Sequence, residues 1–271
     1  MKLNKVNEVP HYLEIINRYR QKGCLTNDYL RQEVDNLVAL GLLYESCGAN
    51  NAYLFVKKEE CMRLYYYIND LQEKTDFSTD ENLVVELVFR GNMGVPETEI
   101  EYLLKSGFHL NLRRDQYGAS YKDLDPPMLI SGVNVRKAKT IDEVSLACNL
   151  FNQVFDHFSG DYISKEMEQS LFECGSMWIA TDMNGKFAGA LHQTIDNNIA
   201  WISHVAVLEE FRGRGVGQAL LDTFVYQNQE NDNSRYMLWV QSKNEPAIRL
   251  YQKKGFKYTN KSTISMIKIN K

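Results

Sequence analysis

The stretch that decides the fold is residues 205–221, which read VAVLEEFRGRGVGQALL. An apolar strand pattern runs into three alternating glycines, and these lead directly into an amphipathic helix. Glycine allows a positive φ and lets a ligand approach the backbone with no Cβ in the way. The first amides of the following helix are unpaired and lie at the positive end of its dipole. The pattern therefore predicts a pyrophosphate-binding loop, with Arg212 and Arg214 adding positive charge.

Two better-known phosphate loops do not fit this sequence. A Walker loop requires G-x-x-x-x-G-K-[ST], and the sequence contains no such run. The Rossmann fingerprint requires G-x-G-x-x-G and an acidic residue about 20 residues further on, at the end of a strand. Here the spacing is G-x-G-x-G, and Asp232 precedes a strand. The loop therefore belongs to another class of phosphate site.

The rest of the second half alternates strand and helix patterns. A capping box of Thr140 and Glu143 marks the start of its first helix. Hydrophobic periodicity predicts strands at 133–138, 177–181, 187–191, 199–208, 236–241 and 264–269, and helices at 140–154, 164–174, 217–229 and 246–254. Such an alternation is typical of an α/β or α+β domain.

Two linked motifs resemble the GCN5-related N-acetyltransferase (GNAT) superfamily. Its signature [QR]-x-x-G-x-[GA] matches residues 212–217, and a second family feature matches residues 244–256, NEPAIRLYQKKGF. The resemblance covers roughly residues 133–271. It implies a GNAT fold, with a mixed, mostly antiparallel central sheet flanked by helices. It also implies an N-acetyltransferase that uses acetyl-CoA as acyl donor and requires no metal.

The resemblance also implies roles for individual residues. The strand segment Val205, Ala206 and Val207 would hydrogen-bond the pantetheine arm, and Tyr251 would be the general acid that protonates the departing CoA thiolate. The remaining predicted cofactor-binding residues are Arg212, Gly213, Arg214, Gly215, Val216 and Gly217 at the pyrophosphate, and Asn244 and Ala247 further along the cofactor.

The chemistry of acyl transfer agrees with these roles but leaves the base open. A tyrosine, with a reference pKa near 10, stays protonated at neutral pH and can donate to a thiolate, whose reference pKa is near 8.5. The acceptor ammonium must lose a proton. In many family members a glutamate in this strand accepts it, yet residues 199–208 contain no acid. His192 and His204 are the candidates, and each also fits a structural role, as Asn244 fits a helix cap and Tyr251 a core position.

The first half looks like a reduced copy of the second. Residues 102–108, YLLKSGF, resemble residues 250–256, LYQKKGF, and an alternating strand follows at 109–114. A hairpin at 52–68, a strand at 83–89 and a helix at 97–105 precede it. The first half is shorter by about the glycine-loop strand and helix, so we expect a degenerate GNAT-like or accessory domain that binds no CoA.

A Pro-Pro pair marks the boundary between the halves. Consecutive prolines donate no backbone hydrogen bonds and disfavour helix before them. We therefore predict an accessory domain at 1–125, a linker at 126–132 and a catalytic domain at 133–271.

Charge and composition exclude several classes of function. The formal net charge is −4, and residues 1–125 hold 15 Lys and Arg against 20 Asp and Glu, so a nucleic-acid partner is not expected. A winged-helix module is the competing reading of the first half, but its recognition helix, 27–40, would carry Arg31 against three acidic residues. The five cysteines form no C-x-x-C pair, and no apolar run has the length of a signal peptide or membrane span. We expect a cytoplasmic protein without metal or membrane partner.

The predicted function is acetyl transfer to a primary amine of a small molecule. Residues 155–162 combine aromatic side chains with Asp156 and Asp161, which would suit a cationic acceptor. The alternatives are a non-catalytic acyl-CoA sensor and an acetyltransferase fused to a winged-helix regulatory module. The sequence leaves the acceptor, the general base and the formation of a homodimer open.

Overall fold

The chain divides into two compact units. The computed structural model describes residues 1–270 except 92–93, 128–129, 160–161 and 231–233. The first unit is Met1–Arg113 with Ser262–Lys271, and the second is Arg114–Lys261. The chain passes from the first unit to the second within strand β7 (His109–Ser120) and returns within β13 (Lys257–Lys268).

This division differs from the predicted domains at 1–125 and 133–271. Residues upstream of the prolines already bond to the second unit, since Tyr121 N donates to Ser234 O and Asp125 N donates to Lys254 O. Residues 114–120 of β7 pair with strand β12. Hydrophobic patterning predicts that a strand exists, but it does not predict which sheet the strand joins.

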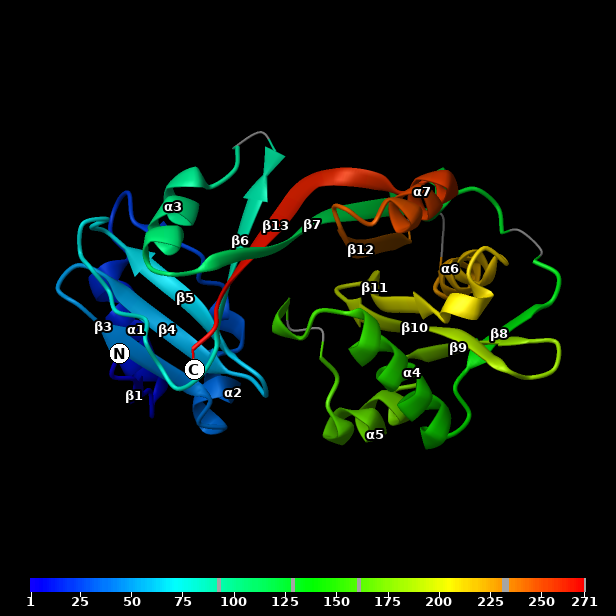
Figure 1. Ribbon diagram of the computed structural model, residues 1–271, viewed down its shortest axis with the longest axis horizontal. Helices are drawn as coiled ribbons and strands as arrows, with labels where there is room; N and C mark the ends of the chain where they lie inside the picture. The colour runs from blue at the N-terminus through cyan, green and yellow to red at the C-terminus, as the bar shows by residue number, and fades with distance from the viewer. Residues whose placement is uncertain (92–93, 128–129, 160–161, 231–233, 271) are drawn as a thin grey trace. The chain divides into compact units, whose positions relative to one another are not determined.

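The sheet of the second unit is mixed and mostly antiparallel, which confirms the predicted fold class (Figure 1). Its strands lie in the order β8-β9-β10-β11-β12-β7, and all neighbours are antiparallel except β11 and β12, which are parallel. The elements of this unit are β8 (Val133–Lys137), α4 (Ile141–Val154), α5 (Lys165–Glu173), β9 (Met177–Asp182), β10 (Phe187–Asp196), β11 (Ile199–Val207), α6 (Val216–Gln227), β12 (Arg235–Gln241) and α7 (Glu245–Lys254).

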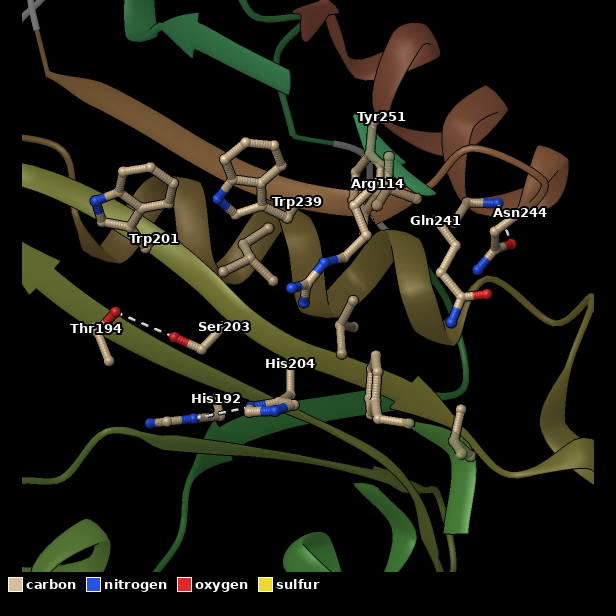
Figure 2. Close-up of a pocket in the computed structure, with 16 residues that line it drawn as sticks. Arg114, His192, Thr194, Trp201, Ser203, His204, Trp239, Gln241, Asn244 and Tyr251 are labelled. Atoms are coloured by element: carbon tan, nitrogen blue, oxygen red, sulfur yellow. Dashed lines mark hydrogen bonds between the residues drawn. The ribbon is translucent and has the colours of Figure 1, made fainter. Parts of the chain in front are cut away.

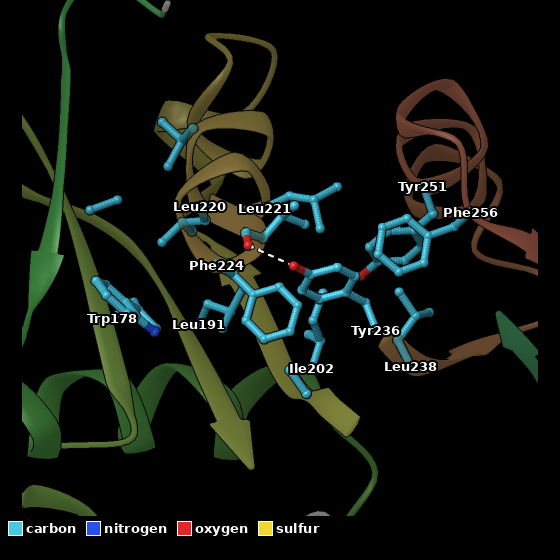
Figure 3. Packing of buried hydrophobic residues seen from close by; sticks show 14 of the residues in the cluster. Trp178, Leu191, Ile202, Leu220, Leu221, Phe224, Tyr236, Leu238, Tyr251 and Phe256 are labelled. Carbon is cyan, nitrogen blue, oxygen red and sulfur yellow. Dashed lines mark hydrogen bonds between the residues drawn. The ribbon is translucent and has the colours of Figure 1, made fainter. Parts of the chain in front are cut away.

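Helices cover both faces of this sheet, and successive side chains of each strand point to opposite faces. On β9, Trp178 and Ala180 pack into the core that α6 and α7 cover. Met177 and Ile179 of the same strand pack into the core beneath α4 and α5. Figure 3 shows the first of these cores, where the Tyr236 hydroxyl donates to Val225 O (2.9 Å). Because both faces are buried, the strands read as nearly continuous apolar runs.

The parallel pair of strands opens at its centre. Residues Ile199–Ile202 of β11 pair with Arg235–Leu238 of β12, and the pairing stops there. On the other side of β11 the register shifts: His192 faces His204 while Gln193 faces Ile202, so Ser203 is an extra residue. Such a bulge bends a strand and increases its local twist. The candidate site lies at this bulge and at the opening between β11 and β12.

The first unit repeats this strand order. Its strands lie in the order β1-β3-β4-β5-β6, with only β5 and β6 parallel. Its elements are β1 (Asn4–Lys5), α1 (Val9–Tyr19), β2 (Leu25–Thr26), α2 (Val34–Ala39), β3 (Leu43–Cys47), β4 (Ala52–Lys57), β5 (Met62–Ile68), β6 (Leu83–Arg90) and α3 (Glu97–Lys105). Strand directions and helix positions match the second unit from β8 to α7, which supports the interpretation of a reduced copy.

The matching corrects one detail of the predicted repeat. The hairpin of β4 and β5 corresponds to β10 and β11, so the strand that precedes the glycine loop has a counterpart in the first unit, although the sequence predicted that this strand is missing there. The counterpart of α6 is missing: between Ile68 and Leu83 the described chain forms turns and no helix. The helix considered at 27–40 is much shorter in the structure, where a 3-10 turn at Leu30–Gln32 and the six-residue α2 form.

The opening between β5 and β6 is closed by the unit's own chain. Asn27 Nδ2 donates to Leu64 O and to Glu86 O (3.2 Å each), and Asn27 Oδ1 accepts from Tyr66 N (2.9 Å). Strand β2 pairs with the end of β5, Leu25 with Ile68 and Thr26 with Tyr67. The backbone groups of β5 at this opening are therefore already paired, while no such strand covers the corresponding part of β11 in the described chain.

Candidate active site

The glycine loop has the backbone that its sequence predicts. Gly213 and Gly215 adopt φ values of +75° and +81°, in the left-handed region that favours glycine. Gly215 is the N-cap of α6, which begins at Val216. The first amides of α6 therefore face away from the helix and towards any anion held at its N-terminus.

The loop cavity, of about 610 Å³, lies between the loop and the end of β11. It takes in every predicted cofactor-binding residue except Arg214: Val205, Ala206, Val207, Arg212, Gly213, Gly215, Val216, Gly217, Asn244 and Ala247. The Arg214 guanidinium lies 5.6 Å from the centre of the Phe211 ring and borders a different pocket. The sequence reasoning missed Gln218, Pro246 and Leu250, which also line the loop cavity.

The glycines differ in what a side chain would meet. A Cβ on Gly215 would lie 2.8 Å from Ile130 Cγ2, in a backbone conformation that other residues avoid. Gly217 lies in the first turn of α6, and a Cβ there would lie 3.4 Å from Leu250 Cδ2 and 3.8 Å from Val207 Cγ2. Both neighbours line the loop cavity, so a side chain at Gly217 would enter it without strain on the backbone.

A second cavity, the histidine cavity of about 480 Å³, lies against the bulge in β11 (Figure 2). Its lining includes Arg114, His192, Thr194, Trp201, Ser203, His204, Trp239 and Gln241. Val205, Asn244, Ala247 and Tyr251 line both cavities, so the two spaces meet beside Tyr251.

Tyr251 is buried at this junction, with 4 % of its surface exposed. Its ring packs near Phe256, with 6.0 Å between ring centroids, so Tyr251 belongs to the core and also lines both cavities. Burial raises the pKa of its phenol above the ordinary value, so the hydroxyl keeps its proton at neutral pH. Among the described residues, none hydrogen-bonds to this hydroxyl, so its proton is available to a ligand.

Asn244 caps helix α7, as its sequence position allows. Its Oδ1 accepts from Ala247 N at 3.2 Å. The same residue lines both cavities, so its amide nitrogen can still contact a ligand.

The two histidines form a pair beneath the histidine cavity. Their rings stack, and Nδ1 of His192 lies 3.2 Å from Nδ1 of His204, so one nitrogen donates a proton to the other. Burial lowers the pKa of His192 to about 4, and the nearby His204 contributes to the same shift. The His192 ring is therefore neutral at pH 7. The rings of Phe151 and Phe155 pack against His204.

The burial of His192 predicts that the folded protein loses stability as the pH falls. His192 has a folded pKa of about 4 and an ordinary value of 6.5, so the unfolded chain binds more protons between these values. Stability is therefore complete above pH 6.5 and falls by up to about 1.4 kcal/mol per pH unit as the pH drops towards 4. We expect His192→Gln to flatten the dependence of the unfolding free energy on pH, measured by urea titration, and His109→Gln at an exposed position to leave it unchanged. Equal slopes for wild type and His192→Gln would contradict the burial argument.

Two residues of the histidine cavity, Arg114 and Trp239, were outside the sequence prediction. Arg114 comes from β7, which is far upstream, and only its pairing opposite Gln241 brings it to the site. Trp239 alternates along β12 with the buried Leu238 and Val240, so its side chain lies on the other face of the strand. Trp201 also lines the cavity, while Trp178 is in the core.

Other expectations concern metals and membranes. Within the described ranges no group of three or more His, Cys, Asp or Glu residues is placed to hold a metal ion. None of the helices described has both the length and the hydropathy needed to cross a membrane. Of the segment 155–162, Phe155 lines the histidine cavity, and Asp161 lies outside the described residues.

Comparisons with known proteins point to one family. Residues 146–256 match the family model "Acetyltransferase (GNAT) family". A comparison with curated proteins found no match. Among solved structures, a GCN5-related N-acetyltransferase from Sphaerobacter thermophilus is similar, with a TM-score of 0.62 and 14% identity over 99% of this chain and 98% of that one. A tandem GNAT protein from the clavulanic acid biosynthesis pathway has a TM-score of 0.53 and 13% identity, over 83% and 82% of the two chains.

A third similar structure belongs to a larger protein. It is the glucosamine N-acetyltransferase region of a fungal multi-domain GH3 β-N-acetylglucosaminidase, with a TM-score of 0.62 and 12% identity. The match covers 98% of this chain and 38% of that one. At these identities the structural matches establish the fold.

Proposed function

Residues 146–256 form an acetyltransferase domain of the GNAT family, and from this premise we propose that the chain is an N-acetyltransferase that moves an acetyl group from acetyl-CoA to a primary amine. The observation that carries this proposal is the junction of the two cavities at Tyr251. One cavity has an anion-binding loop and the other has a pair of imidazoles. A donor in one cavity and an acceptor in the other can therefore both reach Tyr251.

The loop cavity fits acetyl-CoA by shape and by chemistry. The α6 amides and Arg212 would hold the pyrophosphate, and the end of β11 has strand backbone that is not paired with β12 beyond Ile202. An extended pantetheine arm carries amides that can bond to such an edge. A Cβ on Gly217 would intrude on this cavity.

Bound acetyl-CoA would supply the acetyl group and a thiolate leaving group. Tyr251 would hold the proton that the thiolate takes, because burial keeps its hydroxyl protonated. The backbone N–H of Val205, a residue that lines both cavities, would donate to negative charge that develops on the carbonyl oxygen.

The histidine pair would take the proton of the acceptor ammonium in place of the missing glutamate. His192 stays neutral because it is buried, so the positive charge that the pair gains would reside on His204. Neutral His192 can accept a hydrogen bond from the charged ring and so favour that state. His204 is thus the proposed base and His192 its positioning residue.

The cofactor site can be tested at Gly217. We expect Gly217→Val to lower the affinity for acetyl-CoA at least about tenfold, because its side chain would enter the loop cavity. The melting temperature should change little, since Gly217 has helical backbone and glycine is a poor helix former. The measurement is calorimetric titration of each full-length variant with acetyl-CoA.

Ala219→Val is the matched control, because it introduces valine into the same helix at a position that does not line the loop cavity. If the two variants bind acetyl-CoA with equal affinity, the cofactor does not bind in the loop cavity. If acetyl-CoA binds but no amine releases CoA from it in a broad screen, the sensor hypothesis replaces the enzyme.

A further inference from the structure

Two indoles project into the histidine cavity from neighbouring strands. Trp201 of β11 is the strand partner of Met237 on β12, and Trp239 lies two residues beyond Met237. Partner residues in a sheet, and residues two apart along a strand, project from the same face. Both indoles therefore lie on one face of the sheet, and both line the histidine cavity (Figure 2).

The opposite face of the same two strands belongs to the core. Ala200 and Ile202 of β11, and Leu238 and Val240 of β12, pack into the core that α6 and α7 cover. The indoles between them are only partly buried. An indole is one of the largest apolar side chains, and leaving its surface in water costs free energy. Two such surfaces gathered at one cavity indicate a ligand that covers them.

The indoles lie before and after the point where β11 and β12 separate. The pairing of the two strands stops at Ile202 and Leu238, so Trp201 precedes this point and Trp239 follows it. Lys261 Nζ lies over the Trp239 ring, 5.7 Å from its centre, and a cation is attracted to an indole face. This contact restrains the indole, so less conformational freedom is lost when a ligand packs against it.

A ligand on the indoles is continuous with the proposed cofactor site. The histidine cavity also contains His204, and it meets the loop cavity beside Tyr251. The compound that packs against the indoles is therefore the acceptor, whose amine has to reach the same junction. Near the indoles, the hydroxyls of Thr194 and Ser203 are hydrogen-bonded to each other at 3.1 Å, so they need no partner from a ligand.

Indoles favour aromatic rings over saturated groups of the same size. An aromatic ring that meets an indole edge to face, or in an offset stack, gains attraction beyond the area that it buries. A saturated ring buries a similar area without this contribution. The two tryptophans therefore distinguish acceptors by the chemistry of the group attached to the amine.

Resting on the proposed function, we propose that the acceptor is a primary amine that carries an aromatic ring. The ring packs against Trp201 and Trp239, and the amine reaches His204 at the junction with the loop cavity. Trp201 and Trp239 are therefore specificity-determining residues of the acceptor site.

The test uses acceptors that differ in whether their ring is aromatic. The full-length protein with acetyl-CoA is given 2-phenylethylamine and 2-cyclohexylethylamine, 4-phenylbutylamine and 4-cyclohexylbutylamine, and also ethylamine, glucosamine and spermidine. In the pair with the higher kcat/KM, we expect the aromatic member to exceed its saturated partner about 3- to 10-fold. It should exceed ethylamine about 10- to 100-fold, because ethylamine buries no ring. Saturated members that equal the aromatic ones in both pairs would overturn the proposal, as would glucosamine or spermidine acting as the best acceptor.

Variants assign the preference to the indoles. In the double variant Trp201→Leu with Trp239→Leu, the ratio of kcat/KM between aromatic and saturated partners should fall to about one, mainly through KM. Trp239→Phe should retain part of the preference because it keeps an aromatic ring. The ratio compares two acceptors in one sample, so a partial loss of folded protein does not change it.

Tyr226→Leu is the control, because it removes an exposed aromatic ring of α6 that does not line the histidine cavity. It should keep the wild-type ratio. A preference for aromatic acceptors that survives in the double variant would overturn the assignment to the two indoles.

Binding separates this proposal from the proposed function. Calorimetry of the CoA-saturated protein with the same amines requires no turnover, and we expect the aromatic member to bind more tightly in wild type than in the double variant. If acetyl-CoA itself fails to bind, the proposed function fails. If it binds and neither aromatic acceptor binds more tightly than its saturated partner, only the present proposal fails.

Discussion

Tyr251→Phe is expected to lower kcat by about 10² to 10⁴, which is the usual contribution of a positioned general acid. The substitution removes one hydroxyl and keeps the ring that packs near Phe256. No described residue depends on that hydroxyl for a hydrogen bond, so the melting temperature should change little. The affinity for acetyl-CoA should persist because the loop and β11 are unchanged. Steady-state CoA release and calorimetry of the same protein provide the two readouts.

The control is Tyr226→Phe, at an exposed tyrosine of α6. It should match wild type in rate and in stability. Turnover by Tyr251→Phe at the wild-type rate would show that the thiolate takes its proton from water or from another group. A large loss of stability in Tyr251→Phe would instead indicate a role in the core.

Lys254→Met is expected to destabilise the fold by about 3–5 kcal/mol, because it leaves the Asp222 carboxylate buried without its cation. Lys254 Nζ lies 2.6 Å from Asp222 Oδ1 and donates to Asp125 O, and the two charged side chains are 2% and 6% exposed. For a chain of this size, such a loss lowers the melting temperature by roughly 6–20 °C. Urea and thermal unfolding measure it.

Two further variants identify the cause. Lys253→Met, at the neighbouring exposed position of α7, should leave the melting temperature unchanged. The double variant Lys254→Met with Asp222→Leu should recover most of the stability, since it removes the unpaired charge as well. A double variant as unstable as the single one would mean that packing, and not the buried charge, is responsible.

The sequence predicted the local structure of the second unit well. Three glycines between a strand and a helix identify the loop, and the strand and helix patterns between β8 and α7 are strong enough to place each element. The predicted cofactor residues come together, apart from the Arg214 side chain, because most of them lie on two short continuous segments. Local sequence is sufficient for sites of that kind.

The sequence did not predict contacts between segments that are far apart along the chain. Nothing in residues 109–114 indicates that the strand continues to Ser120 and pairs with β12, so Arg114 could not be assigned to the site. The Asp222–Lys254 ion pair joins α6 to α7, and no local pattern in the sequence indicates that these two residues meet. The histidine pair depends on a bulge that leaves Ser203 unmatched, and a bulge has no reliable signature in one sequence.

The first unit has the same arrangement of strands without the elements that form the loop cavity. It keeps the opening of a parallel pair but lacks a counterpart of α6 and of the glycine loop. The Asn27 amide and strand β2 satisfy the backbone groups that such an opening exposes. We therefore expect this unit to bind no acetyl-CoA and to leave one cofactor site in the chain.

Calorimetric titration of the full-length protein with acetyl-CoA tests the central claim most directly, because the claim assigns a single cofactor site to the loop cavity of the second unit. The account predicts binding with a stoichiometry of one acetyl-CoA per chain and at least about tenfold weaker binding by Gly217→Val. An absence of binding, a stoichiometry of two, or unchanged affinity in Gly217→Val would contradict it.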